Sequence, residues 1–287
     1  MLNVLSMVPV RACLFDMDGL LIDTEDIYTL CHNRVLASYG AGPMPWAIKS
    51  QLQGRPAVEA IPYMLTKLDR ADIPVIEYTT RLAAQQLREF PNARPLPGVE
   101  ELLTHLSTSG SASLPVALVT SSSEAHFRLK TAHLAHIFDH FPAPLRILGD
   151  DKRIPENCGK PAPDIYNIAL AALNESLPKN QRPISPEECL VFEDGIPGVA
   201  AALRAGMRVI WIPHPDLAKE YRGHEDAVLT GCIAGLVSDD VHDSDDACGN
   251  KVVDRLAEQL SNLVDFPFDR YSFHPHIPLL QKSHNTN

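Results

Sequence analysis

The sequence predicts an α/β protein whose core is a doubly wound parallel sheet. Short apolar runs rich in β-branched residues alternate with helix-like stretches, which is typical of βαβ units. Polar residues follow several of these runs directly, and a long stretch without a strand interrupts the alternation after the first run. The 287 residues, 45% of them hydrophobic, suit one large domain or a core with a modest insertion.

Four apolar runs are the expected strands, and three stretches are the expected core helices. The strands cover residues 12–15, 115–120, 189–192 and 209–212. Such continuous apolar runs are typical of strands buried on both faces. Helical spacing of apolar residues marks 98–109, 164–173 and 199–205, and the last of these stops at Gly206, a natural C-cap.

Residues 24–94 read as a helical insertion. Ile27, Leu30, Cys31 and Val35 are expected on one helix face, and Leu82 and Leu87 suggest another helix. The segment ends in FPNARPLPG, whose three prolines are typical of a linker. We therefore predict a helical cap domain at 24–94, inserted into a core formed by 1–23 and 95–273.

Composition excludes several classes of function. The formal charge of −11 argues against a nucleic-acid surface, and no apolar stretch is long enough to span a bilayer. The start has no basic residue before Arg11, so we expect no cleaved signal. Six cysteines without a CxxC pair indicate reduced thiols and a cytoplasmic protein. The acidic stretch 238–251 is expected to be an exposed loop, and 274–287 a disordered tail.

Polar side chains gather where the expected strands end. Ligands of an open parallel sheet bind outside the carboxyl ends of its strands. Residues i and i+2 of a strand point to the same side, so Asp16 and Asp18 are expected to converge. The residues predicted at this edge are Asp16, Asp18, Gly19, Thr120, Ser121, Lys160, Glu193 and Asp194.

These residue types fit phosphoryl transfer. Carboxylates with open positions suit Mg²⁺, which accepts a substrate phosphate as a ligand. A hydroxyl, the backbone N–H groups near Gly19 and an ammonium together form a cradle for phosphate. One aspartate can attack phosphorus while the other protonates the departing oxygen.

Four stretches resemble the ordered motifs of haloacid dehalogenase-like (HAD) hydrolases that carry a helical cap after the first motif. They are LFDMDGLLIDTE, LVTSS, GKPAPDIY and CLVFEDGIPGVAAALRAGM. The resemblance implies a Rossmann-like core with Asp16 as nucleophile and Asp18 as general acid and base. It also implies that Thr120 and Lys160 hold the phosphoryl oxygens.

The resemblance extends to the metal and to the substrate. It implies that Mg²⁺ is bound by the carboxylates of Asp16 and Asp194 and by the backbone carbonyl of Asp18, with Glu193 beside them. The residues expected to contact the substrate are Gly19, Thr120, Ser121, Lys160 and, from the cap, Arg55. The partner is therefore a small phosphate monoester, and we expect a monomer.

Within the family, the motifs look most like those of pseudouridine 5′-phosphatases and related sugar-phosphate phosphatases. The resemblance implies a Mg²⁺-dependent phosphatase acting on pseudouridine 5′-phosphate or on a sugar or polyol phosphate. One alternative is a sugar phosphomutase of the β-phosphoglucomutase type, but such mutases carry a histidine where this chain has Tyr28. The other is a non-catalytic phosphoester-binding protein, which loss of Asp16, Asp18 or Lys160 would favour. All three residues are present.

Overall fold

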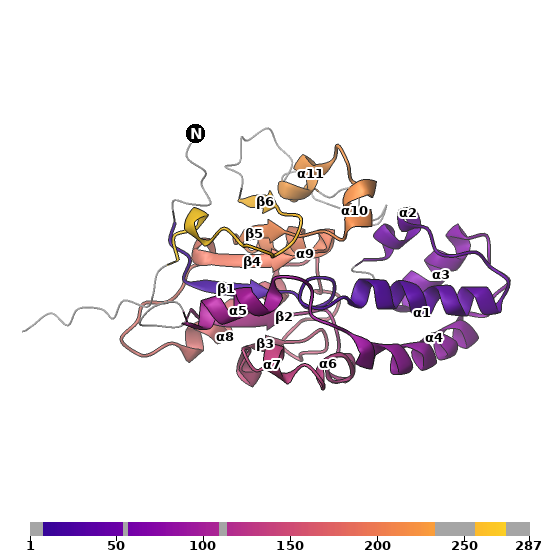
Figure 1. The fold of residues 1–287 in the computed structure, drawn as a ribbon, viewed down its shortest axis with the longest axis horizontal. Coiled ribbons are helices and arrows are strands. Elements are labelled where there is room, and N and C mark those ends of the chain that lie inside the picture. Colours follow the sequence, from indigo (N-terminus) through magenta and orange to yellow (C-terminus); the bar gives the residue numbers. More distant parts are fainter. Residues whose placement is uncertain (1–7, 54–56, 109–113, 233–255, 274–287) are drawn as a thin grey trace, which may run out of the picture.

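A computed structural model describes residues 8–53, 57–108, 114–232 and 256–273, and its centre is a six-stranded parallel sheet (Figure 1). The strand order is β3-β2-β1-β4-β5-β6. The strands are β1 (Ala12–Phe15), β2 (Val116–Val119), β3 (Arg146–Ile147), β4 (Cys189–Glu193), β5 (Arg208–Trp211) and β6 (Ala257–Gln259). The predicted α/β class is confirmed. Strands β3 and β6 were not predicted, because their two and three residues are too short to form an apolar run.

Helices cover both faces of the sheet, as the doubly wound prediction requires. Alternate residues of β1 enter opposite apolar layers, so that Leu14 packs in one and Phe15 in the other. The layer around Phe15 contains α5 (Val99–Thr108), α6 (Glu124–Thr131) and α7 (Ala135–Phe138). The layer around Leu14 contains α8 (Asp164–Ser176), α9 (Ile196–Arg204), α10 (Pro215–Glu220) and α11 (Glu225–Leu229).

The register of the central strands decides where polar residues meet. Strand β1 lies between β2 and β4, and Phe15 pairs with both Leu118 and Phe192. The residues that follow these positions therefore emerge side by side at the carboxyl edge of the sheet. Asp16 and Glu193 come together in this way.

The secondary structure described between residues 24 and 92 is helical. It comprises α1 (Thr24–Ser38), α2 (Trp46–Lys49), η2 (Ser50–Leu52), α3 (Ala57–Lys67), α4 (Val75–Glu89) and η3 (Phe90–Asn92). Figure 1 shows this segment beyond the carboxyl ends of the central strands. The segment has its own apolar cluster, which includes Cys31, Val35, Tyr78 and Leu82.

One expected apolar contact of this segment is wrong. Leu30 is 40% exposed, whereas Leu82 and Leu87 both lie in the predicted second helix, α4. Helix α1 instead buries Cys31, Val35 and Leu36 where it packs against α4. Only one side of α1 faces α4, so the apolar stripe formed by these buried residues leaves Leu30 on the exposed flank of the helix.

The helical segment joins the core through two connections that lie side by side. The Asp23 backbone N–H donates to the Arg94 carbonyl at 3.0 Å, and the Asp23 carboxylate accepts from the Arg94 N–H at 2.7 Å.

None of the helices that the structure describes is long and apolar enough to cross a membrane. The five cysteines in the described ranges are free thiols. The expected acidic loop 238–251, the tail 274–287 and Arg55 lie outside the described residues.

Candidate active site

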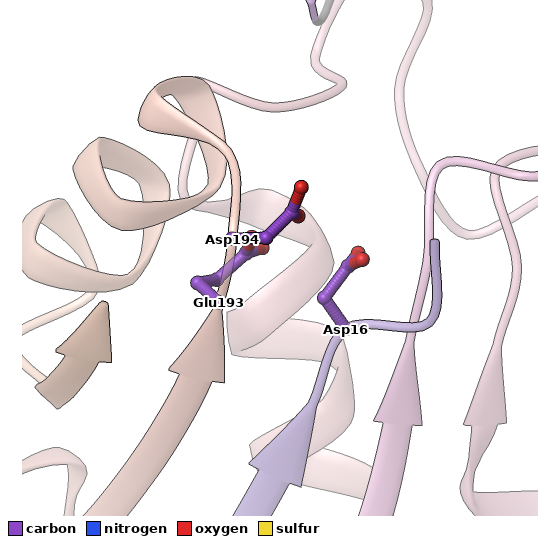
Figure 2. Close-up of side chains that lie close together, drawn as sticks. All are labelled: Asp16, Glu193 and Asp194. Carbon is purple, nitrogen blue, oxygen red and sulfur yellow. The ribbon is translucent and has the colours of Figure 1, made fainter. Parts of the chain in front are cut away.

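Three carboxylates meet at the carboxyl edge of the sheet (Figure 2). Asp16 directly follows β1, Glu193 is the last residue of β4, and Asp194 follows it. One oxygen from each carboxylate lies within 4.8 Å of the others, and all three residues are buried. Because the strands are neighbours, two motifs that are far apart in the sequence form one group of acids.

The Lys160 ammonium lies inside this group. Its Nζ donates to Asp16 Oδ1 at 2.6 Å, to Glu193 Oε1 at 2.6 Å and to the Val119 carbonyl at 2.9 Å. The Tyr166 hydroxyl donates to the same Glu193 oxygen at 2.6 Å. Lys160 therefore has all three of its protons engaged and is held against Asp16.

The carboxylates of this cluster outnumber its ammonium. Burial raises the pKa of Asp16 to about 8, since the charges of Glu193 and Asp18 add to desolvation and only Lys160 opposes them. Burial and the charge of Asp16 raise the pKa of Asp194 well above its ordinary value. A further cation would relieve this excess of negative charge.

Magnesium fits this donor set. Carboxylate oxygens are ligands that Mg²⁺ prefers, and among the described residues no cationic side chain forms an ion pair with Asp194 as Lys160 does with Asp16. Glu193 is placed differently, because Oε1 accepts from Lys160 and Tyr166 while Oε2 lies 3.4 Å from the Gly195 N–H. In this arrangement Glu193 orients Lys160, and its role as a metal ligand stays a prediction.

The Asp18 carboxylate lies in a second cluster, contrary to the expected convergence with Asp16. Strand β1 ends at Phe15, so the two-residue alternation does not extend to Asp18. Oδ1 of Asp18 accepts from Thr24 Oγ1 and Lys130 Nζ, both at 2.6 Å, and Oδ2 accepts from Ser122 Oγ at 2.7 Å. Burial acts to raise the pKa of Asp18, but the charge and hydrogen bond of Lys130 outweigh it, so the pKa is lowered.

Lys130 is the main site residue that was not predicted from the sequence. It is fully buried in α6, on the same face as Phe127 and one turn before Leu134. A lysine at a position where helical periodicity demands an apolar residue is the signal that could have found it. Ser122 was also missed. It is buried, whereas the predicted Ser121 is exposed.

Gly19 allows the backbone to pass beside Asp194. Its φ of +79° favours glycine, and a Cβ there would lie 2.4 Å from Asp194 Oδ2. The Asp194 backbone is fixed from the other side, because the buried Trp211 donates its indole N–H to the Asp194 carbonyl at 2.8 Å.

The second-motif residue Thr120 is fully buried at the end of β2. Its backbone N–H donates to the Ile147 carbonyl at 3.0 Å, and its Oγ1 accepts from the Ser122 N–H at 3.1 Å. Thr120 therefore orders the turn that directs Ser122 toward Asp18. The roles of Thr120 and Ser121 toward a substrate stay predictions.

An open parallel sheet with a buried group of carboxylates and one lysine at its carboxyl edge is an arrangement typical of hydrolases that form an aspartyl intermediate. Residues 10–206 match the haloacid dehalogenase-like hydrolase family, and the chain belongs to that family. The family resemblance drawn from the four motifs is thereby confirmed.

Similar proteins include phosphatases and a mutase. A probable pseudouridine-5′-phosphatase of Saccharomyces cerevisiae is 46% identical over 78% of this chain and 91% of its own length. A (DL)-glycerol-3-phosphatase of Arabidopsis thaliana is 34% identical over 77% of this chain and 70% of its own length. The crystal structure of a putative β-phosphoglucomutase from Thermotoga maritima has a TM-score of 0.54 and 28% identity, covering 73% of this chain and 91% of that one.

Proposed function

We propose that this protein is a Mg²⁺-dependent phosphatase that hydrolyses a small phosphomonoester through an aspartyl-phosphate. The observation that carries the proposal is the contact of Asp16 with Lys160 inside a buried group of carboxylates. The relatives named as phosphatases of pseudouridine 5′-phosphate and glycerol 3-phosphate support a sugar or polyol phosphate, or pseudouridine 5′-phosphate, as the substrate.

The carboxylates of Asp16 and Asp194 and the backbone carbonyl of Asp18 would hold the metal, with Glu193 beside them. When bound, Mg²⁺ supplies positive charge that favours the ionised form of Asp16 and offsets charge on the phosphoryl group. Lys160 adds a second positive charge beside Asp16.

In the first half of the reaction, an ionised Asp16 oxygen attacks phosphorus. A phosphorus–oxygen bond forms to Asp16 while the bond to the leaving alkoxide breaks. Asp18, in its protonated form, gives its proton to that alkoxide, which departs as an alcohol. Lys160 and Thr120 hold the phosphoryl oxygens during this transfer.

In the second half, water replaces the alcohol. Asp18, now ionised, takes a proton from the water as its oxygen attacks phosphorus. The bond between phosphorus and Asp16 breaks, inorganic phosphate forms, and both aspartates return to their starting states. The hydrogen bonds that Asp18 accepts in the structure suit the ionised state that this half requires.

We propose that the helical segment 24–94 acts as a cap that selects the leaving group and excludes bulk water during transfer. Its position beyond the carboxyl ends of the strands supports this role (Figure 1). Arg55, Gly19 and Ser121 are the remaining proposed substrate contacts. The cytoplasmic location and the monomeric state also stay predictions.

The test is phosphate release in the presence of Mg²⁺. The panel contains pseudouridine 5′-phosphate, nucleotides, and hexose, pentose and polyol monophosphates, each measured with the wild type and with Asp16→Asn. We expect a clear preference within the panel and no release by the variant. Release that persists in Asp16→Asn would exclude Asp16 as the nucleophile.

The same panel separates the phosphomutase alternative. A mutase would convert glucose 1-phosphate to glucose 6-phosphate with little release of phosphate. Tyr28 stands where the resemblance places the mutase histidine, and its hydroxyl accepts from Lys130 at 2.8 Å. We therefore expect hydrolysis and no isomerisation.

A further inference from the structure

We propose that Lys130 is a positioning residue that fixes the Asp18 carboxylate for proton transfer to the leaving group. The inference rests on the proposed function, because it assumes that Asp18 is the general acid. It assigns a task to a residue that lies outside the four motifs.

The Lys130 ammonium uses all three of its protons within one small cluster. Nζ donates to Asp18 Oδ1 at 2.6 Å, to Ser122 Oγ at 2.8 Å and to Tyr28 OH at 2.8 Å. Ser122 in turn donates to the other Asp18 oxygen at 2.7 Å. Lys130 and Ser122 therefore hold both oxygens of Asp18 and fix the plane of its carboxylate.

Aromatic rings confine the ammonium from the side of the helical segment. Nζ lies 4.7 Å from the ring centroids of both Tyr28 in α1 and Phe90 in η3. These distances are typical of cation–π contacts. Lys130 thus connects Asp18 to α6 of the core and to two elements of the segment 24–94. Contacts with both parts therefore fix the position of the Asp18 carboxylate.

Stability alone gives a poor account of a lysine at this place. A buried ammonium loses its hydration, and replacement of a buried ion pair by apolar residues is often neutral or stabilising. The face of α6 that carries Lys130 also carries Phe127, so an apolar residue would continue the core. A lysine that contacts the proposed general acid is better explained by placement of that acid.

The dependence on the leaving group tests this role. Glycerol 3-phosphate has an alkoxide leaving group that needs a proton, whereas p-nitrophenyl phosphate has a leaving group that departs without one. The measured quantity is kcat/KM, which covers the steps up to formation of the aspartyl-phosphate and not its hydrolysis. The proteins compared are the wild type, Lys130→Met, Lys130→Arg and Asp18→Asn.

We expect Lys130→Met to lower kcat/KM for the alkyl phosphate about 100-fold, within the range that general acid catalysis contributes, and to lower kcat/KM for the nitrophenyl ester far less. Asp18→Asn should likewise lose more kcat/KM on the alkyl phosphate than on the nitrophenyl ester, and Lys130→Arg should recover part of the alkyl activity because it keeps a donor cation. An equal loss on both esters in Lys130→Met, or no loss on either, would overturn the inference.

Two controls make the outcomes distinguishable. If the wild type releases no phosphate from any ester, or if Asp18→Asn shows no dependence on the leaving group, the proposed function fails first. If only the Lys130 variants lack the dependence, the inference alone fails.

Thermal unfolding shows whether Lys130→Met folds. If it does not fold, Tyr28→Phe replaces it as the test variant. Tyr28→Phe keeps the ring but removes one Nζ acceptor, so it should weaken the alkyl reaction several-fold, and equal effects on both esters would again overturn the inference.

Discussion

The two aspartates of the first motif, Asp16 and Asp18, are two residues apart but lie in opposite electrostatic surroundings. Asp16 shares a buried site with Glu193 and Asp194, and these three carboxylates face the single ammonium of Lys160. Asp18 is one carboxylate that accepts from one ammonium and two hydroxyls. Accordingly, the pKa of Asp16 is raised to about 8 and that of Asp18 is lowered.

The contrast shows that the motif builds two sites rather than one. The Asp16 cluster has an excess of negative charge, which a bound cation would neutralise. The Asp18 cluster is balanced by protein groups alone. Without metal, these pKa directions are opposite to those that an ionised nucleophile and a protonated general acid need, so the proposed division of tasks depends on a cation beside Asp16. Variants that act on only one cluster therefore test the division.

The largest expected effect is on turnover in Asp16→Asn. An amide is a far weaker nucleophile than a carboxylate, so we expect phosphate release to fall by at least about 10⁴-fold. The variant should remain folded, because it removes one of three mutually repelling carboxylates and keeps the contact of Lys160 with Glu193. Phosphate release and thermal unfolding, measured on the same preparation, check both points.

A matched control is the same substitution at Asp139, which is exposed at the end of α7. Asp139→Asn should retain wild-type turnover. Comparable loss in the two variants would mean that the effect of Asp16→Asn does not come from the active site.

The second prediction separates the clusters by their response to Mg²⁺. A ligand that binds only the native state at 100 times its Kd adds about 2.7 kcal/mol to the free energy of unfolding. We expect Mg²⁺ to stabilise the wild type and Asp18→Asn, but not Asp194→Asn, because Asp194 contributes its carboxylate to the proposed metal site whereas Asp18 contributes only its backbone carbonyl. Thermal unfolding with Mg²⁺ and with excess chelator measures this difference.

Both variants should lose turnover, and so should the chelated wild type. Stabilisation of Asp194→Asn by Mg²⁺ to the wild-type extent would contradict the metal assignment. Loss of the stabilisation in Asp18→Asn would mean that the Asp18 side chain also contributes to the metal site and that the two clusters are not independent.

The third prediction concerns the dependence of stability on pH without metal. A carboxyl whose native pKa lies above its unfolded value binds a proton that the unfolded chain has released, so its contribution to stability falls as pH rises between those values. For Asp16 this window runs from its ordinary pKa of 3.8 to about 8. We expect the Tm of the chelated protein to fall by a few degrees from pH 5 to pH 8.

Either saturating Mg²⁺ or Asp16→Asn should reduce the fall of Tm between pH 5 and pH 8. Asp18 has the opposite sign, because its lowered pKa gives stability that is present above pH 3.8 and is lost in more acidic solution. A Tm of the chelated protein that rises between pH 5 and pH 8 would contradict the charge excess around Asp16.

The sequence predicted one cluster better than the other for a physical reason. Asp16, Glu193 and Asp194 stand at or just after strand ends, and strand order brings such residues to one edge, while Lys160 comes from the loop ahead of α8. The partners of Asp18 depend on tertiary packing. Lys130 reaches Asp18 from the last turn of α6, and helical periodicity marks its position as buried without revealing that this helix face meets the motif.

The fold shows the same limit. The pattern of apolar runs located β1, β2, β4 and β5, which are buried on both faces. It did not locate the short strands β3 and β6 at the edges of the sheet. In the helical segment, periodicity indicated the helices α1 and α4 but misplaced Leu30, because the packing of α1 against α4 decides which flank of α1 is covered.

The smallest expected effect concerns Gly19, which lies between the two clusters. Gly19 and Gly40 have similar backbone angles, with φ of +79° and +69°, but a Cβ at Gly19 would lie 2.4 Å from Asp194 Oδ2 whereas a Cβ at Gly40 would meet nothing within 4 Å. Gly40→Ala should therefore cost only the strain of a left-handed residue, roughly 1 kcal/mol, without loss of turnover. Gly19→Ala should cost more free energy of unfolding than this and also weaken stabilisation by Mg²⁺, because the added methyl group displaces the Asp194 carboxylate.

Urea unfolding and phosphate release, measured on both variants, give the comparison. Equal costs with full turnover in Gly19→Ala would mean that the position of Asp194 is not limiting and that the boundary between the clusters tolerates a side chain.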